Sequence, residues 1–236
     1  MNTWRYLDSG PKSGAENMAL DEDILLQAAD GAAIPTLRLY TWDPPAVSLG
    51  RFQKIETSVN AEACKRRGIE IVRRGTGGRA VLHNHELTYC FVSRADNRLF
   101  PGDVPGTYKV IASGLLAGLR NLGIHAEMVS RSARHAALVK KGDKDPSCFS
   151  SPSWYEILVN GKKIIGSAQR RLSSAFLQHG SILIKYDPAL ESEVIPGAGA
   201  RNSITCIEAE LGMAVDIEDV KKAFKQGFSQ ALSVTF

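Results

Sequence analysis

The chain has 236 residues, and 29 Lys and Arg against 25 Asp and Glu give it a formal net charge of +4. Hydrophobic residues make up 44% and charged residues 23%, an ordinary globular balance that excludes the disordered, collagen-like and disulfide-rich classes. One large domain or two small ones of this length could bury a core without a stabilising metal or disulfide. A net charge of +4 is too small for this length to predict a nucleic-acid partner, and none is expected.

The start of the chain and its hydropathy predict neither export nor membrane insertion. Met1 to Asp8 has no basic segment followed by an apolar one, and no apolar run approaches the ~18 residues of a membrane span. The cysteines are far apart and form no C-x-x-C pair, which excludes a zinc ribbon or a disulfide framework. We therefore expect free thiols in the reducing cytoplasm and no membrane partner.

The first predicted helix spans residues 13–29, where apolar side chains recur on one helical face. Ser13 and Glu16 have the spacing of a capping box, and Gly31 is the predicted stop. The run Asp43-Pro44-Pro45 cannot continue a helix or a central strand, so it predicts a turn between two strands. The other elements predicted for this half are strands at 36–42 and 46–50, a helix at 58–67, and strands at 69–72 and 87–92.

The second half contains the clearest hairpin signal. Two extended runs, 154–159 and 162–168, flank Asn160-Gly161, which readily adopts the positive φ angles of a two-residue turn. Residues 130–153 are basic, polar and interrupted by glycine and proline, which predicts a long loop of a kind that is often functional. The remaining predictions are a helix at 105–122, a strand at 176–185, a glycine-rich turn at 196–202 and a helix at 216–232. Because hairpins outnumber strand-helix-strand units, we predict an α+β fold with mostly antiparallel sheets packed with helices.

A segment rich in glycine and arginine, residues 73–83, reads RRGTGGRAVLH. Glycine lets the backbone approach a ligand, and arginine supplies planar donors for carbonyl, carboxylate or phosphate oxygens. The segment matches neither a Walker A nor a Rossmann fingerprint. It is therefore either a ligand-binding loop of another kind or a tight structural turn with solvated arginines.

The cysteines differ in their surroundings. Three have core-like neighbours and are expected to be small buried residues, namely Cys64, Cys90 and Cys206. Cys148 lies in the predicted long loop among several lysines, a polar and electropositive setting that can stabilise a thiolate. It is either a nucleophile or an inert thiol, and Lys163 on the returning strand of the hairpin is either its activator or a solvated lysine.

Two histidines, His83 and His85, would face the same side of an alternating strand, as metal ligands can. No third ligand with recognisable spacing accompanies them, so we expect no metal site. His83 is instead interpreted as a pocket residue or a structural hydrogen-bonding residue.

Several motifs in a fixed order resemble the lipoate protein ligase and octanoyltransferase family. They are the segment 73–83, CFSSPSWYE at 148–156, GKKIIGSAQ at 161–169 and QHGS at 178–181, with NMALD at 17–21 and GRFQ at 50–53. The similarity runs from Trp4 to the last helix. It is closest to the LipM-type octanoyltransferases of the family, which have a loop cysteine matched by Cys148 and a lysine matched by Lys163.

This resemblance implies a fold, an activity and a set of site residues. The fold is the class II synthetase-like α+β domain of biotin and lipoate ligases, expected as one catalytic domain over residues 1–236 without the accessory C-terminal domain of ligases. The activity moves octanoate from octanoyl acyl carrier protein, through a cysteine thioester, to a lysine of a lipoyl domain or glycine-cleavage H protein, without a cofactor. Cys148 and Lys163 are the implied catalytic residues. The implied substrate-binding residues are Arg73, Arg74, Thr76, Gly77, Gly78, Arg79, His83, Ser167, Ala168, His179 and Gly180.

Two other functions stay open. In an ATP-dependent lipoate or octanoate ligase, which uses ATP and Mg, Lys163 would contact the acyl-adenylate and Cys148 would be incidental. Such ligases typically carry a third glycine where this chain has Arg79, and they lack the loop cysteine. A catalytically silent protein that binds lipoylated domains is the third interpretation. For the octanoyltransferase, the modest positive charge would speed encounter with acyl carrier proteins and lipoyl domains, which are typically acidic.

Overall fold

The computed structural model describes residues 2–130, 155–198 and 203–236. The elements are, in chain order, β1 (Asn2–Thr3), β2 (Arg5–Lys12), α1 (Gly14–Ala29), β3 (Thr36–Trp42), β4 (Ala46–Leu49), α2 (Ile55–Ser58), α3 (Ala61–Arg67), β5 (Glu70–Arg73), β6 (Val81–His83), β7 (Glu86–Arg94), α4 (Val104–Asn121), β8 (Glu127–Ser130), β9 (Tyr155–Val159), β10 (Lys162–Arg171), β11 (Ala175–Leu183), α6 (Pro188–Val194), α7 (Ile207–Leu211), α8 (Ile217–Leu232) and β12 (Val234–Thr235).

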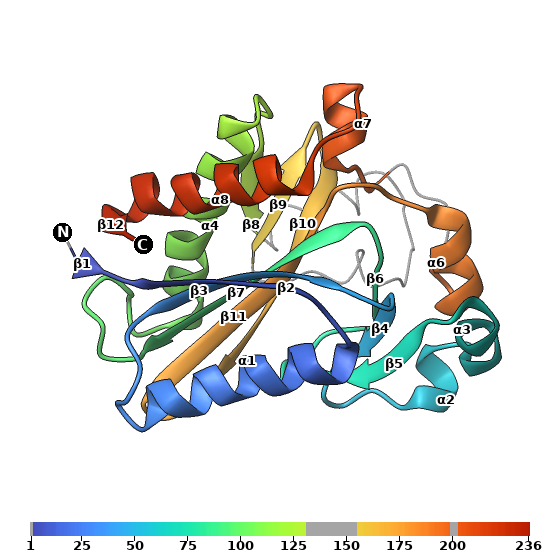
Figure 1. The fold of residues 1–236 in the computed structure, drawn as a ribbon, viewed down its shortest axis with the longest axis horizontal. Coiled ribbons are helices and arrows are strands. Elements are labelled where there is room, and N and C mark those ends of the chain that lie inside the picture. Colours follow the sequence, from blue (N-terminus) through green and yellow to red (C-terminus); the bar gives the residue numbers. More distant parts are fainter. Residues whose placement is uncertain (1, 131–154, 199–202) are drawn as a thin grey trace.

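A seven-stranded sheet forms the centre of the molecule, with the strand order β2-β3-β7-β11-β10-β9-β8 (Figure 1). Only the β2–β3 pair within it is parallel. A three-stranded sheet, β5-β4-β6, lies beside it, and β1 pairs with β12 near both ends of the chain. This arrangement of helices around mostly antiparallel strands confirms the predicted α+β class.

Helices cover both faces of the large sheet (Figure 1). The helices α4 and α8 lie over one face, where Leu39, Tyr89 and Phe91 belong to the main apolar core. The helix α1 lies over part of the other face, against Cys90 and Val92. Alternate residues of β7 therefore serve two separate cores, as the period of two in a strand requires. The rest of the α1 face lies under the small sheet and is available for a site.

Local sequence signals account for the elements that were predicted well. The Ser13 hydroxyl accepts a hydrogen bond from the Glu16 backbone amide, and the Glu16 carboxylate accepts one from the Ser13 backbone amide. The predicted capping box at the start of α1 is therefore present. Asn160 and Gly161 have φ angles of 49° and 75° and join β9 to β10, which confirms the predicted hairpin. The predicted helices at 105–122 and 216–232 correspond to α4 and α8.

Other predictions about the fold were wrong in detail. The helix predicted at 58–67 begins only at Ala61, as α3, because Val59 is extended and Asn60 caps the helix by accepting from the Ala63 amide; a separate short helix, α2, ends at Ser58. The two strands predicted on either side of Asp43-Pro44-Pro45 are confirmed as β3 and β4, although they belong to different sheets. The strand β6 ends at His83, and His85 has a φ of 53° in the following turn, so the two histidines do not alternate on one strand. The predicted loop 130–153 lies almost entirely outside the described residues.

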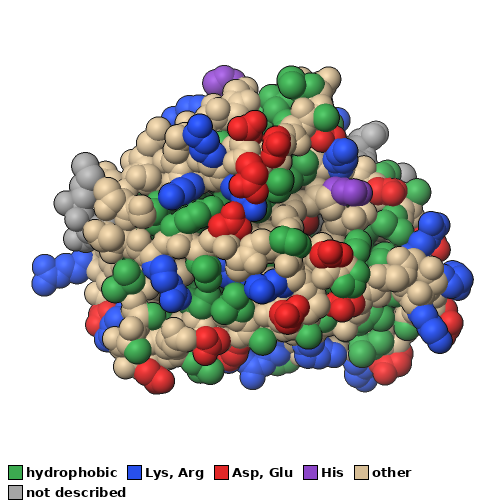
Figure 2. All heavy atoms as spheres, in the orientation of Figure 1, with side chains coloured by type: hydrophobic (Ala, Val, Ile, Leu, Met, Phe, Trp, Pro, Cys, Tyr) green, Lys and Arg blue, Asp and Glu red, His purple; other side chains and the backbone are tan. Residues whose placement is uncertain are grey.

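The surface in the orientation of Figure 2 carries mixed charge. Lysine and arginine side chains are dispersed among acidic and apolar ones on this face rather than gathered into one patch. Among the helices of the described ranges, none is long and apolar enough to cross a membrane.

Candidate active site

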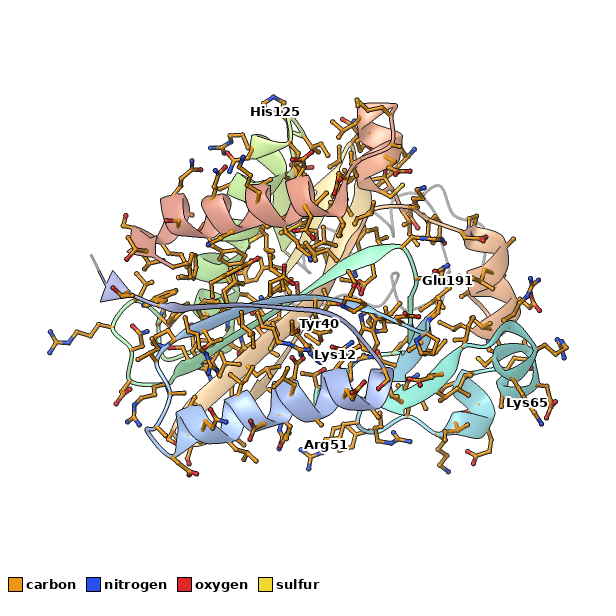
Figure 3. All side chains as sticks on the ribbon, in the orientation of Figure 1. Lys12, Tyr40, Arg51, Lys65, His125 and Glu191 are labelled. Atoms are coloured by element: carbon orange, nitrogen blue, oxygen red, sulfur yellow. The ribbon has the colours of Figure 1, made fainter. Side chains whose placement is uncertain are left out.

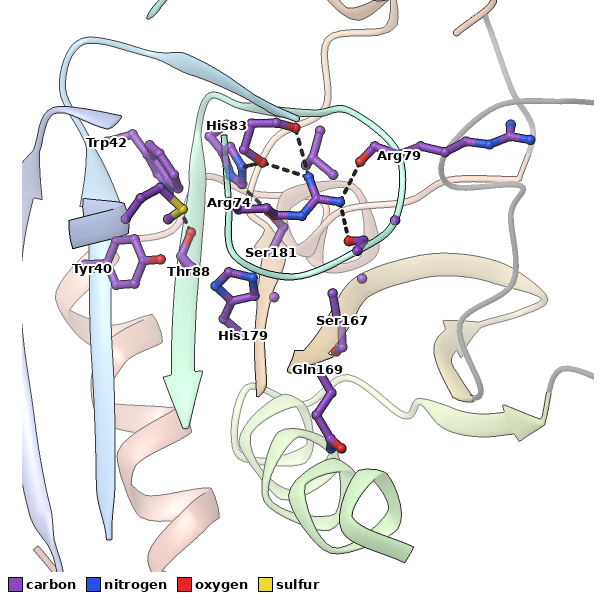
Figure 4. Close-up of a pocket in the computed structure, with 18 of the residues that line it drawn as sticks. Tyr40, Trp42, Arg74, Arg79, His83, Thr88, Ser167, Gln169, His179 and Ser181 are labelled. Carbon is purple, nitrogen blue, oxygen red and sulfur yellow. Dashed lines mark hydrogen bonds between the residues drawn. The ribbon is translucent and has the colours of Figure 1, made fainter. Parts of the chain in front are cut away.

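A cavity of about 310 Å³ lies on the α1 face of the seven-stranded sheet, between the sheet and residues 74–81 (Figure 4). Its size is at the lower end of the range for small-molecule sites. We call it the pocket. Its lining consists of Met18, Tyr40, Trp42, Ser48, Arg74, Gly77, Gly78, Arg79, Val81, His83, Thr88, Tyr108, Lys163, Gly166, Ser167, Ala168, Gln169, His179, Gly180 and Ser181.

The floor of the pocket is one row of residues that crosses four neighbouring strands. Tyr40 pairs with Thr88, Thr88 with Ser181, and Ser181 with Gly166, which takes the row from β3 to β10. Thr88, Ser181 and Gly166 are small, so the row forms a trough, and the aromatic ring of Tyr40 closes it at the β3 end. Gly180 is required beside it, since a Cβ there would collide with the backbone oxygen of Gly166.

Lys163 reaches the pocket from β10 at a β-bulge. The ladder with β9 shifts register between Lys163 and Ile165, which leaves Ile164 as an extra residue. Bulges of this kind bend a strand and re-aim its side chains. The side chain of Lys163 is buried, and its Nζ donates to Oε1 of the buried Glu156 at 2.8 Å. The amine of Lys163 is thus held inside the protein at the edge of the pocket, against a carboxylate.

Arg74 organises the loop that covers the pocket. Its guanidinium donates to the backbone oxygens of Ser48, Gly77 and Arg79 at 2.7–2.8 Å, and the loop winds around it in Figure 4. The loop also packs closely on the end of β4, because a Cβ on Gly50 would collide with the backbone of Gly78. Arg74 therefore shapes the loop as well as lining the pocket.

A buried polar network connects the loop to α1. The imidazole of His179 contacts Thr76 Oγ1 through Nε2 at 2.8 Å and Asp21 Oδ2 through Nδ1 at 2.9 Å. Asp21 also accepts from Arg38 at 2.5 Å and from the Tyr40 hydroxyl at 2.9 Å. Burial alone would raise the pKa of Asp21, but the hydrogen bond and charges of His179 and Arg38 hold it below its usual range. Asp21 is therefore ionised near neutral pH and anchors the network, in which Figure 3 places Tyr40 inside the molecule.

A second polar cluster lies around His83 near the Trp42 wall of the pocket. The His83 ring stacks on Trp42 with 3.9 Å between centroids, and its Nε2 lies 2.7 Å from Ser48 Oγ. Its Nδ1 lies 3.1 Å from Oε1 of Glu86. Burial lowers the pKa of His83, although the Glu86 carboxylate opposes this shift, so the neutral ring is favoured near pH 7. The ring orders this wall of the pocket.

Most of the site residues predicted from the sequence meet in the pocket. The ones that line it are Arg74, Gly77, Gly78, Arg79, His83, Lys163, Ser167, Ala168, His179 and Gly180. Thr76 is buried behind the lining and contacts His179. Arg73 does not line the pocket, because its guanidinium donates to the backbone oxygens of Gly50, Arg51 and Gln53 and holds that turn. Cys148 lies outside the described residues.

The other cysteines behave as the sequence predicted. Cys64, Cys90 and Cys206 are free and buried. Burial raises the pKa of Cys64 and raises the pKa of Cys90 well above its usual range, which disfavours a thiolate at either position.

Several site residues were not singled out from the sequence. Asp21 ends the NMALD run and Glu156 ends the SPSWYE run, so both had a motif signal but no assigned role. Tyr40 and Trp42 had none, since an aromatic residue in a strand usually indicates core. Among the described residues, no group of three or more His, Cys, Asp or Glu is placed to hold a metal ion.

Comparison with known proteins identifies the family. The model of the lipoyl protein ligase A/B catalytic domain matches residues 13–229. The chain belongs to this family. The octanoyltransferase LipM of Brevibacillus brevis is 42% identical over 244 residues, covering 99% of this chain and 88% of the relative. The LipM of Carboxydothermus hydrogenoformans is 41% identical over 246 residues, covering 100% and 89%.

A solved structure of this family has the same fold. Lipoate-protein ligase A bound with ATP is 27% identical, with a TM-score of 0.82 over 100% of this chain and 87% of the ligase. These findings confirm the predicted fold and the prediction of an octanoyltransferase in lipoate biosynthesis.

Proposed function

We propose that this family member transfers octanoate from octanoyl acyl carrier protein, through a thioester on Cys148, to a lysine of a lipoyl domain or glycine-cleavage H protein. One observation carries the proposal at the level of the site, which is the buried amine of Lys163, paired with Glu156, beside a narrow trough of small residues. The LipM relatives support the same acyl group. The proposed reaction needs no cofactor.

The dimensions of the trough suit an eight-carbon acyl chain. Tyr40 on β3 and Gly166 on β10 are three interstrand spacings apart, or roughly 14 Å. An extended octanoyl chain, a zigzag of C–C bonds of about 1.5 Å, is about 9 Å long. A chain whose carbonyl lies near Lys163 therefore ends before the wall formed by Tyr40 and Trp42.

The proposed chemistry has two balanced steps. In the first, the Cys148 thiolate attacks the donor thioester, a new C–S bond forms, the bond to the carrier sulfur breaks, and the carrier leaves as a thiolate. In the second, the acceptor amine attacks the octanoyl-cysteine, the amide bond forms, the C–S bond to Cys148 breaks, and the proton lost by the amine goes to the cysteine sulfur. The Lys163 ammonium would stabilise the oxyanion that develops in both steps, a role worth several kcal/mol in comparable sites.

Intact-mass spectrometry after incubation with octanoyl acyl carrier protein tests the covalent step. The wild-type chain should gain one octanoyl group that hydroxylamine removes, and Cys148→Ser should gain none. Cys64→Ser is the matched control, because that thiol is buried away from the pocket and should leave acylation unchanged. Transfer by Cys148→Ser at the wild-type rate would contradict the mechanism.

The competing ligase function is distinguished by its cosubstrate. The ATP-bound ligase of the same fold makes adenylation the natural alternative for this pocket. Pyrophosphate released from ATP on addition of lipoate or octanoate would support the ligase, and octanoyl transfer without ATP would exclude it as the main activity.

Our proposal also includes action in the cytoplasm, where free cysteines such as Cys64 and Cys90 persist.

A further inference from the structure

Lys163 does not enter the pocket alone, because a carboxylate lies directly behind it. Its Nζ is 2.8 Å from Oε1 of Glu156, and the two side chains are 5% and 1% exposed. Two charges removed from water to this degree need each other, since removing either partner leaves the other uncompensated. The pair is therefore a fixed feature of the site.

The backbone of the hairpin enforces this pairing. Lys163 is opposite Leu158 in the β9–β10 ladder, and Glu156 is two residues before Leu158 on β9. Glu156 and Lys163 are thus diagonal neighbours on one face of the sheet, within reach of long side chains. The backbone of Lys163 also donates to Ser203 and accepts from Thr205, which fixes the strand at this point.

Among the buried groups named here, Glu156 is the one whose charge favours the ammonium form of Lys163. Among the described residues that line the pocket, none is a carboxylate. The titratable groups that line the pocket together with Lys163 are Tyr40, Arg74, Arg79, His83, Tyr108 and His179. The other titratable groups on β9 and β10 and on the elements that contact β9 are Lys109 and Arg120 on α4, Glu127 on β8, Tyr155 on β9, and Lys162, Arg170 and Arg171 on β10. The nearby arginines would by themselves favour the neutral amine, so Glu156 has to offset them.

We infer that Glu156 is a positioning residue that keeps Lys163 protonated and directed at the acyl carbonyl. This inference rests on the proposed function. With Glu156 in this role, Lys163 donates a hydrogen bond to the developing oxyanion in both steps and does not act as a general base. The proton lost by the attacking amine then goes to the departing cysteine sulfur, so that the amide bond forms, the C–S bond breaks and the thiol is restored. Glu156 takes no part in bond making.

Two readouts test this assignment in Glu156→Gln, which keeps the shape and loses the charge. The first is acetic anhydride labelling of Lys163, followed by peptide mass spectrometry from pH 7 to 9.5, because only the neutral amine reacts. Labelling in the variant should be about 10 to 1000 times faster than in the wild type, the effect expected on losing a close opposite charge. The second is the rate of octanoyl transfer over the same range, which should fall with rising pH in the variant while the wild type holds its rate.

Two further variants separate charge from fold. Glu127→Gln removes the same charge from an exposed side chain on the adjacent strand β8 and should leave both readouts at wild-type values. Glu156→Asp keeps the carboxylate and should restore wild-type labelling together with at least a tenth of the transfer rate. Thermal unfolding identifies any variant that has lost its fold. If Glu156→Gln does not fold, the labelling and the transfer rate of Glu156→Asp become the test.

The outcomes distinguish this inference from the proposed function. The positioning role would be overturned if Lys163 in Glu156→Gln were labelled at the wild-type rate. It would also be overturned if labelling were faster but the pH profile of octanoyl transfer were unchanged. A variant that transfers faster at neutral pH would show that Lys163 acts as a base, which also overturns it. A wild-type chain that transfers no octanoate would overturn the proposed function, while the labelling result would still decide whether Glu156 holds the charge on Lys163.

Discussion

Replacement of Asp21 by Asn should destabilise the protein strongly and in a pH-dependent way. Asp21 is 3% exposed and is the carboxylate that joins Arg38, Tyr40 and His179. Asn keeps the shape but removes the charge that compensates Arg38, whose side chain is fully buried. The amide also brings a donor group into a position where all of these partners now donate to the carboxylate.

The size of the effect follows from the burial of the pair. Removing one partner of a buried ion pair costs about 3 to 5 kcal/mol, because an uncompensated charge stays inside. Arg38 still donates to Asn17 and Ser9 in the variant, which favours the lower end of that range. For a domain of this size, about 3 kcal/mol lowers the Tm by about 6 to 12 °C.

The pH dependence has a definite sign. The pKa of Asp21 is depressed in the folded state, whereas an unfolded Asp titrates near ~3.9. Its contribution is therefore fully present above about pH 4 and is lost as pH falls through the lower, folded-state value. The asparagine of the variant has no proton to bind, so the difference in unfolding free energy between wild type and variant should shrink only below about pH 4.

Urea unfolding at pH 7, 5, 4 and 3, followed by circular dichroism, measures both quantities. Asp23→Asn is the matched control, because Asp23 is an exposed residue on the same helix and its replacement should change stability by no more than ~0.5 kcal/mol. A loss below about 1 kcal/mol at pH 7, or a difference that persists undiminished at pH 3, would refute this account of the network.

Three further substitutions probe the core, the floor and the loop. Phe224→Ala empties a fully buried site on α8 against Gly118 of α4, and urea unfolding should report a loss of about 3 to 5 kcal/mol. Gly180→Ala places a methyl group on the backbone oxygen of Gly166, and thermal unfolding should report a loss of about 1 to 3 kcal/mol. Arg74→Lys cannot hold the loop carbonyls as a fork, and kcat/KM for octanoyl acyl carrier protein should fall about 10²-fold with little change in Tm.

The parts of the fold with a local code could be predicted from the sequence. The Ser13 and Glu16 capping box sets the start of α1, and the Asn160-Gly161 turn sets the β9–β10 register, so both depend on residues within four positions of each other. The strand β2 was not predicted, because RYLDSGPK does not alternate between apolar and polar residues. Its extended form depends on parallel pairing with β3, which begins 31 residues after it does.

The site was predicted only where a motif marked it. The arginine-glycine segment was found, but the function of its arginines could not be, because donation from Arg73 and Arg74 to backbone carbonyls is a result of how the loop closes. Asp21 and His179 are 158 positions apart, and only the packing of α1 on the sheet brings them together. Sequence spacing carries no information on such a contact.

The extra residue in β10 divides that strand into two stretches with different tolerances to change. Ile164 and Ile165 are consecutive, yet both belong to the main core, which a regular strand would not allow. Deleting Ile164 would leave a regular ladder in which Lys163 and residues 165–171 keep their present faces, but it would remove a fully buried side chain from the main core. Changes at Ile164 are therefore limited by the volume of its side chain. A residue inserted or deleted between Ile165 and Arg171 would instead turn the rest of the strand to the opposite face, so length is under stricter constraint in the regular stretch than at the bulge.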